Sequence, residues 1–318
     1  MDASMKGKTV LFTGASRGMG RFAAIELARR GAEILVVGHH EARGAAAVQA
    51  IRDIRGSAEF LRADMGDAAE VCALADAVLA RSRSIDVLIH GAGGMPPSGA
   101  RTREGVDLGF AQNFLGAFLL TRLLEERLLV SAPARLISVG SGAHRLVKSV
   151  DIDALMRPGK HLSHMRRYQM GSYQMRSYQI SKLAVTTWTY GLASRWADRG
   201  VTANVLDPGL VKTEIGEQFE GPAPIRILMN HVFPFFVAVG MERGSEQYVR
   251  LAADPALATV SGMYFVSGKE KKASSSPLSL DPAVQKRIDD VAEAWAAPFL
   301  PARLLSGPTL TRAKAEGL

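Results

Sequence analysis

Three tyrosines, Tyr168, Tyr173 and Tyr178, recur at intervals of five residues, and only the third has a lysine, Lys182, four positions later. Residues four apart in an α-helix lie on one face, so the ammonium group of Lys182 would lie beside the phenol of Tyr178. An ammonium group favours the phenolate and lowers the pKa of a tyrosine from its usual value of about 10. This pair therefore predicts a side chain that transfers a proton near neutral pH.

The other two tyrosines have serine at the fourth position and lack this partner. Five residues turn a helix by about 140°, so the three rings cannot form a stripe along one helix face. Tyr168 and Tyr173 either line a substrate pocket or cover surface. A tyrosine and a lysine at this spacing also occur by chance, so a structural role for Tyr178 stays open until other motifs are considered.

A glycine-rich turn, TGASRGMG at residues 13–20, follows the first predicted strand and begins the first predicted helix. Gly14, Gly18 and Gly20 allow a tight turn and a close approach of the backbone to a pyrophosphate, which the helix N-terminus attracts. The turn therefore predicts a dinucleotide site. A tight turn without a ligand is the alternative.

The end of the second predicted strand indicates which dinucleotide binds. NAD sites usually place an acid there to bind the ribose 2′-hydroxyl. Here the chain reads Gly38-His39-His40, with no acid before Glu41, and Arg17 lies in the glycine-rich turn. Basic groups without a carboxylate favour a 2′-phosphate, so we predict NADP(H) rather than NAD(H). His39 as a solvated loop residue is the alternative, and no companion ligands at metal spacing support a metal site.

Short apolar runs alternate with helix-like segments along the chain. Strands are predicted at 9–14, 33–38, 58–64, 86–93, 135–142, 201–209 and 262–266, and helices at 20–31, 41–55, 67–82, 104–129, around Tyr178 and at about 281–296. This alternation predicts βαβ units and a parallel sheet covered on both faces, which is an α/β fold. We expect one domain over residues 1–270 and a C-terminal extension over 271–318.

Composition excludes several classes of protein. The 318 residues are 47% apolar and 22% charged, as in ordinary globular proteins. The single cysteine, Cys72, permits no intrachain disulfide, and neither a signal peptide nor a membrane span is recognisable, so we expect a cytoplasmic protein without membrane association. The net charge of +8 is scattered rather than clustered, which argues against nucleic-acid binding and suits an enzyme with a polyanionic cofactor.

The three motifs occur in a fixed order: the glycine-rich turn, then Ser141 after the fifth predicted strand, then Tyr178 with Lys182. With this order, the chain resembles the short-chain dehydrogenase/reductase family over residues 6–270, and most of all its retinol dehydrogenase-like and WW-domain-oxidoreductase-like branch. The segments that suggest this branch are SGAHR (141–145), SKLAV (181–185), DPGLVKTE (207–214) and GMYFVSGKEKKASS (262–275). The resemblance implies a single Rossmann-type, doubly wound parallel sheet of about seven strands in the order 3-2-1-4-5-6-7, flanked by helices.

The resemblance also implies roles for four catalytic residues. Tyr178 would be the general acid in reduction and the base in oxidation. Lys182 would lower the pKa of Tyr178 and hold the nicotinamide ribose. Ser141 would hydrogen-bond the substrate oxygen, and Asn113, in QNFLG, would hold a water in a proton relay. A serine and a tyrosine hydroxyl suit the developing alkoxide charge of a carbonyl substrate.

The cofactor contacts implied by the resemblance extend over five loops. Asp64 would lie near the adenine, Ala92 and Gly93 near the adenine ribose, and the turn after residue 207 near the nicotinamide. The full set comprises Gly14, Ser16, Arg17, Gly18, Met19, Gly20, His39, Asp64, Met65, Ala92, Gly93, Tyr178, Lys182, Pro208, Gly209, Val211 and Thr213. We expect no metal.

The chain departs from the family pattern in two places. His90-Gly91 replaces the usual Asn-Asn after the fourth strand, and the missing asparagine normally ties neighbouring strands together, which puts the rigidity of the loop near the cofactor in question. The interval from Ser141 to Tyr178 is long, and we expect a loop there that shapes the substrate pocket.

The segment 217–240 lies where the family builds its substrate lid, at about 214–240 here, and it is rich in Phe, Leu, Ile and Val. It predicts a lipophilic alcohol, ketone or aldehyde substrate, with a helix that packs on the core or on a partner chain as the alternative. A non-catalytic NADP(H) sensor or partner-binding protein, and a family enzyme of other chemistry (epimerase, lyase or double-bond reductase), also stay open. Homodimers and homotetramers are common in this family.

Overall fold

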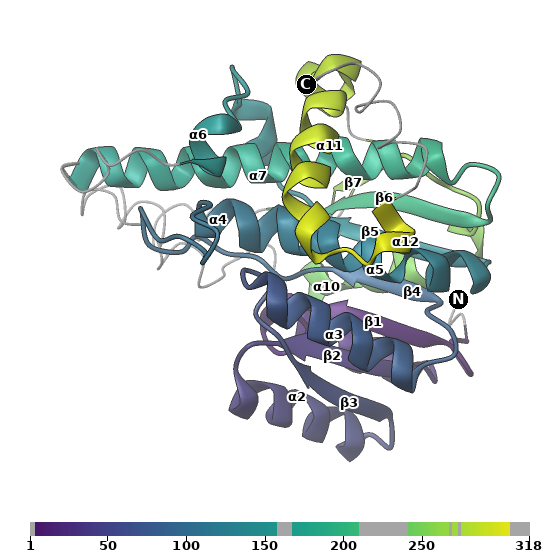
Figure 1. The fold of residues 1–318 in the computed structure, drawn as a ribbon. Helices are drawn as coiled ribbons and strands as arrows, with labels where there is room; N and C mark the ends of the chain where they lie inside the picture. The colour runs from purple at the N-terminus through teal and green to yellow at the C-terminus, as the bar shows by residue number, and fades with distance from the viewer. Residues whose placement is uncertain (1–3, 158–166, 210–240, 267–268, 273–274, 306–318) are drawn as a thin grey trace.

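The computed structural model describes residues 4–157, 167–209, 241–266, 269–272 and 275–305. A sheet of eight strands lies at the centre of the molecule in the order β3-β2-β1-β4-β5-β6-β7-β8 (Figure 1). The strands are β1 Thr9–Thr13, β2 Glu33–Gly38, β3 Ser57–Arg62, β4 Val87–His90, β5 Ala134–Val139, β6 Val201–Asp207, β7 Tyr264–Val266 and β8 Lys269–Lys272. The first seven are parallel, which confirms the predicted order, and β8 adds an antiparallel strand beside β7.

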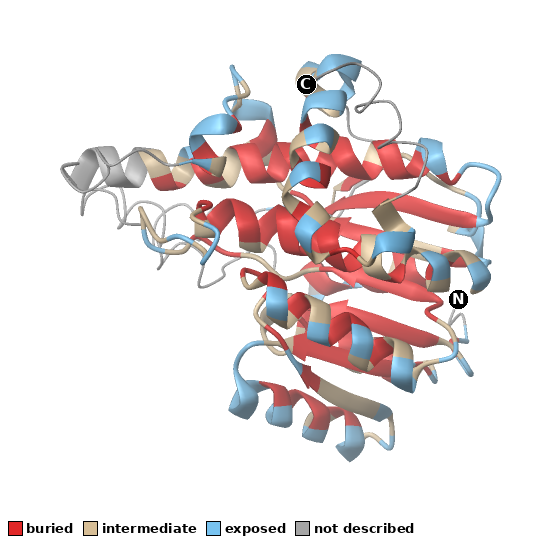
Figure 2. Ribbon diagram, viewed as in Figure 1, coloured by how far each residue is buried: buried red, intermediate tan, exposed pale blue. Residues whose placement is uncertain are grey.

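Helices cover both faces of the sheet. Side chains alternate along a strand, so Leu11 of β1 faces one apolar layer while Val10 and Phe12 face the other. The first layer lies under α3 Ala68–Arg81, α5 Gly116–Val130, α7 Arg167–Arg195 and α11 Pro282–Ala296, and the second under α1 Gly18–Arg29, α2 Glu41–Asp53 and α10 Met241–Ala253. Figure 2 shows most of the strands and the inner sides of these helices as buried, while the edge strand β3 is mostly of intermediate burial. Both faces are therefore covered, as a parallel sheet requires.

The helix predicted from residue 104 begins later, at Leu108. Asp107 is its N-cap, because its side-chain oxygen accepts a hydrogen bond from the Phe110 N–H at 2.9 Å. The short helix α4 Leu108–Phe110 continues through a π-helical turn, Ala111–Leu115, into α5. Such wide turns often occur at functional sites, and this one carries Asn113.

The long loop expected before the helix of Tyr178 is partly helical, and that expectation is wrong. Residues Gly142–Leu146 form a 3₁₀ helix (η2), α6 spans Asp153–Met156, and α7 already begins at Arg167. Tyr173 and Tyr178 therefore lie in the same helix. Nothing is described of the Tyr168 side chain.

The C-terminal helix α11 is part of the same packed structure. Its Ile288, Ala292 and Ala296 are buried in the apolar layer that also contains α5 and α7, and Glu293 pairs with Arg122 of α5 at 3.0 Å. The predicted helix at 281–296 is thereby confirmed, and α12 Ala302–Leu305 follows it. Among the described helices, none combines the length and the apolar character needed to cross a membrane.

Candidate active site

The glycine-rich turn packs directly against the loop after β4. Gly14 has a φ of +82°, and a Cβ there would lie 2.6 Å from the Gly91 carbonyl carbon. The loop therefore needs glycine both for its backbone conformation and for this close approach. The turn joins β1 to α1 beside β4, where the strand order of the sheet reverses, and ligands of open α/β sheets bind at such points.

The start of α1 has the properties of an anion site. Arg17 is its N-cap residue but makes no side-chain cap hydrogen bond, and the first turn contains no acid. The backbone N–H groups of that turn, from Gly18, have no partner within the helix, and the helix dipole adds partial positive charge. Met19 packs on the apolar layer, and a Cβ on Gly38 would lie 2.7 Å from the Ser16 Oγ, so the turn also contacts the end of β2.

The two histidines after β2 differ in their environment. His40 caps α2, because its Nδ1 accepts a hydrogen bond from the Arg43 N–H at 3.4 Å. His39 is exposed directly after Gly38. No group of three or more His, Cys, Asp or Glu side chains able to hold a metal occurs in the described part of the chain.

The loop after β3 holds Asp64 and Met65 in fixed positions. The Asp64 carboxylate accepts a hydrogen bond from the Gly66 N–H at 2.8 Å. Met65 is buried, and the start of α5 packs so closely on it that a Cβ on Gly116 would clash with the Met65 carbonyl oxygen. The loop therefore lies between the sheet edge and α5.

The replacement of Asn-Asn by His90-Gly91 leaves the β4 loop tied on both sides. The Thr13 hydroxyl accepts hydrogen bonds from the N–H groups of Gly91 and Ala92, each at 3.2 Å, and so links β1 to this loop. His90 Nε2 lies 2.7 Å from the Thr121 hydroxyl of α5, and burial lowers the His90 pKa to about 3, which keeps the ring neutral. Hydrogen bonds with Thr13 and Thr121 thus hold the β4 loop in place of the missing asparagine.

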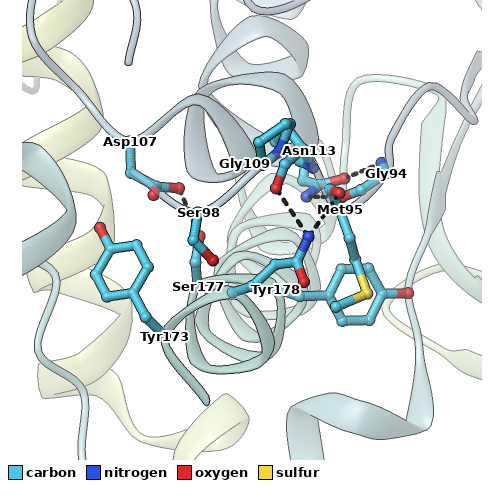
Figure 3. A pocket seen from close by; sticks show the side chains of 12 residues that line it. Gly94, Met95, Ser98, Asp107, Gly109, Asn113, Tyr173, Ser177 and Tyr178 are labelled. Carbon is cyan, nitrogen blue, oxygen red and sulfur yellow. Dashed lines mark hydrogen bonds between the residues drawn. The ribbon is translucent and has the colours of Figure 1, made fainter. Parts of the chain in front are cut away.

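Asn113 is hydrogen-bonded to this loop (Figure 3). Its side-chain oxygen accepts from the Gly94 N–H and its amide donates to the Gly94 carbonyl, both at 2.9 Å. A Cβ on Gly93 would clash with the Asn113 side-chain oxygen and lie 3.6 Å from the Lys182 Nζ. Asn113, Gly93 and Lys182 therefore meet at one point.

Tyr178, Lys182 and Ser141 converge at the carboxyl end of β5. Lys182 is buried, its Nζ donates to the Val139 carbonyl at 2.8 Å, and it lies 5.7 Å from the centre of the Tyr178 ring. Ser141 follows two residues after Val139 and caps η2 by accepting from the Ala143 N–H at 3.3 Å. The structure thus brings together the four predicted catalytic residues, including Asn113.

The pKa of Tyr178 is raised rather than lowered, contrary to the sequence-based expectation. Burial is the main cause, the Asp207 carboxylate adds to it, and a hydrogen bond with Ser141 acts in the opposite direction. Burial also lowers the pKa of Lys182 to about 8, against the opposing effect of Asp207. Desolvation is therefore the largest influence on the pKa of both groups.

The turn expected at the nicotinamide begins with a buried carboxylate. Pro208 is buried and Gly209 is exposed, and the Gly209 N–H donates to the Asp207 carboxylate at 2.9 Å. Val211, Thr213 and the expected lid at 214–240 lie outside the described residues. The remaining predicted cofactor residues lie in loops at the carboxyl edge of the sheet, in the first turn of α1 or on α7.

Tyr173 lines a small cavity of about 10 Å³ beside Tyr178 and Asn113 (Figure 3). Its hydroxyl is buried near Asp107, and burial together with that carboxylate raises the Tyr173 pKa. Asp107 also accepts from the Ser177 hydroxyl at 2.5 Å. Tyr173 therefore lines this cavity, and whether the cavity belongs to a substrate pocket stays a prediction.

Sequence reasoning missed three side chains that organise this site. Thr13 ends β1, Asp107 caps α4, and Asp207 ends β6, where its second carboxylate oxygen accepts from the Tyr264 hydroxyl at 2.8 Å. Their positions could have indicated these residues, because each is a polar residue at the end of a strand or helix on the same side of the sheet as the glycine-rich turn.

Comparison with known proteins agrees with this geometry. The sequence model of the family described as short chain dehydrogenase matches residues 8–149 and 167–222. The chain belongs to the short-chain dehydrogenase family. Members of this family are oxidoreductases that bind NAD(P), and this chain is an oxidoreductase of the retinol dehydrogenase-like kind.

Curated relatives share about a third of their residues with this chain. Retinol dehydrogenase 14 of Homo sapiens is 34% identical over 306 residues, covering 91% of this chain and 86% of that protein. Retinol dehydrogenase 12 of Homo sapiens is 34% identical over 266 residues, covering 83% and 79%. Retinol dehydrogenase 13 of Homo sapiens is 32% identical over 293 residues, covering 90% and 83%.

Solved structures have the same fold. An uncharacterised protein from Mycobacterium paratuberculosis superposes with a TM-score of 0.70 at 25% identity and covers 93% of this chain and 95% of that chain. A protein from Beutenbergia cavernae, described as an NAD(P)-dependent gluconate 5-dehydrogenase with bound NADP, superposes with a TM-score of 0.64 at 27% identity and covers 83% and 96%.

Proposed function

We propose that this protein is an NADP(H)-dependent oxidoreductase that interconverts an alcohol and a ketone or aldehyde, with Tyr178 as the general acid and base. The observation that carries this proposal is the convergence of Tyr178, Lys182 and Ser141 at the end of β5, on the same edge of the sheet as the glycine-rich turn. Under this proposal residues 1–270 form the catalytic domain and residues 271–318 its C-terminal extension.

The residues present fit a dinucleotide. The close backbone approach at Gly14 and the uncapped start of α1 form a cradle for a pyrophosphate, and Asp64, Gly93 and Lys182 lie in the loops and helix around the same sheet edge. The remaining contacts are those of the sequence prediction. When bound, the cofactor supplies the hydride.

The protein's own groups supply orientation and the proton. In reduction, the hydroxyls of Ser141 and Tyr178 donate hydrogen bonds to the substrate oxygen, and the Tyr178 proton moves to that oxygen as negative charge develops on it. Since burial raises the Tyr178 pKa, the phenolate that remains needs the positive charge of Lys182 nearby. Asn113 holds the Gly94 backbone and, through it, the wall of the site, and we propose that it also holds the water of a proton relay.

The preference for NADP(H) is supported by the end of β2. His39 is exposed there, Arg17 lies in the adjoining glycine-rich turn, and His40 is used as a helix cap. No carboxylate follows β2 before Glu41, so a 2′-phosphate would meet basic groups and no opposing charge.

A lipophilic substrate is supported by two observations. The relatives with about a third of their residues in common are named retinol dehydrogenases, and retinol is a lipophilic alcohol. The segment 217–240 also has the apolar composition expected of a lid over such a substrate. Tyr173, which lines the same cavity as Tyr178, would then contact the substrate chain.

The test is a fluorescence titration with NADPH and with NADH, followed by turnover of a panel of lipophilic carbonyls and alcohols with product analysis. Tighter NADPH binding and carbonyl reduction are expected. Tighter NADH binding would contradict the role of Arg17 and His39. Cofactor binding without turnover would favour a sensor, and products of another reaction would favour an epimerase, lyase or double-bond reductase.

A further inference from the structure

Asp207 is a buried carboxylate at the end of β6, and its hydrogen bonds come from neutral donors. It is 5% exposed, one oxygen accepts from the Gly209 N–H at 2.9 Å, and the other accepts from the Tyr264 hydroxyl at 2.8 Å. No ion pair to this carboxylate is formed by any residue in the described ranges. Among the described residues its negative charge therefore has no ion-pair partner, and a buried charge without such a partner is costly.

The position of Asp207 places that charge beside the catalytic groups. The carbonyl of Val139 in β5 accepts the hydrogen bond from Lys182, and Val139 lies opposite Leu206 in β6. Asp207 is the residue after Leu206, so it lies on the neighbouring strand one residue further along. A Cβ on Gly142 would lie 3.4 Å from the Asp207 carboxylate, so the carboxylate also lies against the turn that follows Ser141. Neighbouring strands are about 4.8 Å apart, which brings the two sites within range of a strong electrostatic interaction.

Other side chains also contact the turn that follows Ser141. His144 Nδ1 lies 2.7 Å from the Ser141 carbonyl, and its ring packs on that of Tyr264 at 5.1 Å. Arg145 lies 5.3 Å from the centre of the Tyr264 ring. Asp207 and Tyr264 thus connect β6 and β7 to the turn that carries Ser141.

We propose that Asp207 is a positioning residue of this site, whose buried carboxylate stabilises the Lys182 ammonium beside Tyr178 electrostatically. This inference rests on the proposed function. In an otherwise dry site the lysine would lose its charge readily, and a neighbouring negative charge opposes that loss. Among the described residues, the titratable and charged groups that interact with Asp207 or its immediate partners are Tyr178, Lys182 and Tyr190 from α7, His144 and Arg145 from η2, Tyr264 from β7 and Tyr248 from α10.

The test is the pH dependence of turnover in Asp207→Asn, which removes the charge and keeps the shape. Loss of the negative charge lowers the pKa of both Lys182 and Tyr178. We expect the alkaline limb of carbonyl reduction and the rising limb of alcohol oxidation to move to lower pH by roughly one unit. A fall in rate at all pH values with both limbs unmoved would overturn the proposal, because a purely structural role predicts that result.

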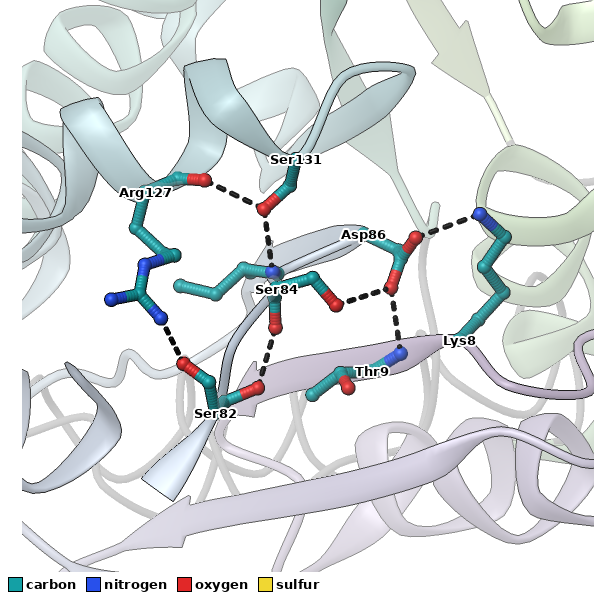
Figure 4. Close-up of polar contacts among 8 residues, drawn as sticks. Lys8, Thr9, Ser82, Ser84, Asp86, Arg127 and Ser131 are labelled. Carbon is teal, nitrogen blue, oxygen red and sulfur yellow. Dashed lines mark hydrogen bonds and ion pairs between the residues drawn. The ribbon is translucent and has the colours of Figure 1, made fainter. Parts of the chain in front are cut away.

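Two further variants sharpen the test. Asp207→Glu keeps the charge, so its limbs should stay within a fraction of a unit of the parent protein, and a shift as large as that of Asp207→Asn would overturn the proposal. Asp86→Asn is the matched control, because Asp86 is a second buried aspartate, 8% exposed, at the opposite end of the sheet (Figure 4). It should leave both limbs in place, and an equal shift in this control would also count against a specific role of Asp207.

If Asp207→Asn does not fold, Tyr264→Phe carries the test. It removes one neutral donor and leaves the carboxylate charge less offset, so both limbs should move to higher pH, and limbs that stay or move lower would overturn the proposal. Failure of the proposed function is distinguishable, because it would appear as absence of turnover in the unsubstituted protein with either cofactor. Normal turnover there with unmoved limbs in the variants would contradict only the role of Asp207.

Discussion

The two ends of the sheet both bury an aspartate, and they treat its charge in opposite ways. Asp86, just before β4, pairs with the Lys8 ammonium at 2.7 Å and accepts from the Thr9 N–H at 2.9 Å and the Ser84 hydroxyl at 3.3 Å (Figure 4). Asp207, at the end of β6, accepts from two neutral donors in the described part of the chain, the Gly209 N–H and the Tyr264 hydroxyl. The amino end thus pairs its buried carboxylate with a cation, whereas the carboxylate at the carboxyl end has only neutral partners among the described residues and, under our proposal, acts on Lys182 and Tyr178.

The polar groups around Asp86 are also hydrogen-bonded to near neighbours. The Ser131 hydroxyl accepts from the Ile85 N–H at 2.9 Å and donates to the Arg127 carbonyl at 2.6 Å, and the Arg127 guanidinium donates to the Ser82 carbonyl. At the carboxyl end, by contrast, burial shifts the pKa values of Tyr178 and Lys182. Perturbed pKa values in groups that lie together at the carboxyl end of a parallel sheet are typical of a functional site.

The largest expected effect comes from Tyr178→Phe. Removing the hydroxyl takes away the proton donor, so turnover should fall by about 10³-fold while NADPH binding and thermal stability are retained. Steady-state kinetics with a fluorescence titration checks this. Tyr173→Phe is the matched control from the same helix, and it should keep most of the activity. Near-normal rates in Tyr178→Phe would contradict the assignment.

The next effect comes from Gly93→Ala. A Cβ there would clash with the Asn113 side-chain oxygen and crowd Lys182, so the loop or the lysine must shift. A displacement of this order costs about 100-fold in kcat. Stopped-flow or steady-state rates at saturating cofactor measure it. Gly105→Ala is a control, since no atom lies within 4 Å of a Cβ there, and its positive φ of +81° tests backbone strain alone.

The pH dependence of the unsubstituted protein should be set by Lys182. Burial lowers its pKa to about 8, so the ammonium is charged below that pH and neutral above it. The raised pKa of Tyr178 keeps the tyrosine protonated over the same range. Carbonyl reduction should therefore fall as the pH rises through about 8. A rate that is flat from pH 7 to pH 10, measured at saturating cofactor, would be inconsistent with a role for the lysine charge.

The smallest effect on activity is expected from Asp86→Asn, although stability should change. The substitution removes the Lys8 ion pair and weakens the hydrogen bond from Thr9, which we expect to lower the free energy of unfolding by about 2 kcal/mol at neutral pH. Chemical denaturation measures this, and kcat should stay within about twofold of the parent. A large loss of kcat in a folded variant would remove the distinction between the two ends of the sheet.

The sequence predicted the fold well because its signals are local. Apolar runs bounded by glycine located all seven parallel strands, with β2 at the predicted 33–38. The motif residues also converge as expected, because parallel strands end at the same edge of the sheet. Helix starts were predicted less well. The helix predicted from residue 104 begins at Leu108, because its start is set by the side-chain cap of Asp107.

What the sequence could not provide is the environment of each site residue. The pKa of Tyr178 is governed by burial, which depends on residues distant in the chain, whereas the i, i+4 lysine was the only visible influence. The hydrogen bonds of Thr13 to Gly91 and of Asp207 to Tyr264 join residues more than fifty positions apart. No periodicity or short motif encodes such pairings.

The single helix α7 carries Tyr173, Tyr178 and Lys182, and this sets how the enzyme's selectivity can diverge. Residues of one helix keep their separation, about 7.5 Å of rise between Tyr173 and Tyr178, whatever side chain stands at position 173. A substitution there changes the pocket wall without moving the proton donor. An insertion between the two would instead rotate position 173 by about 100° relative to Tyr178. New substrates are therefore accessible to this scaffold by point substitution along α7, at constant catalytic geometry.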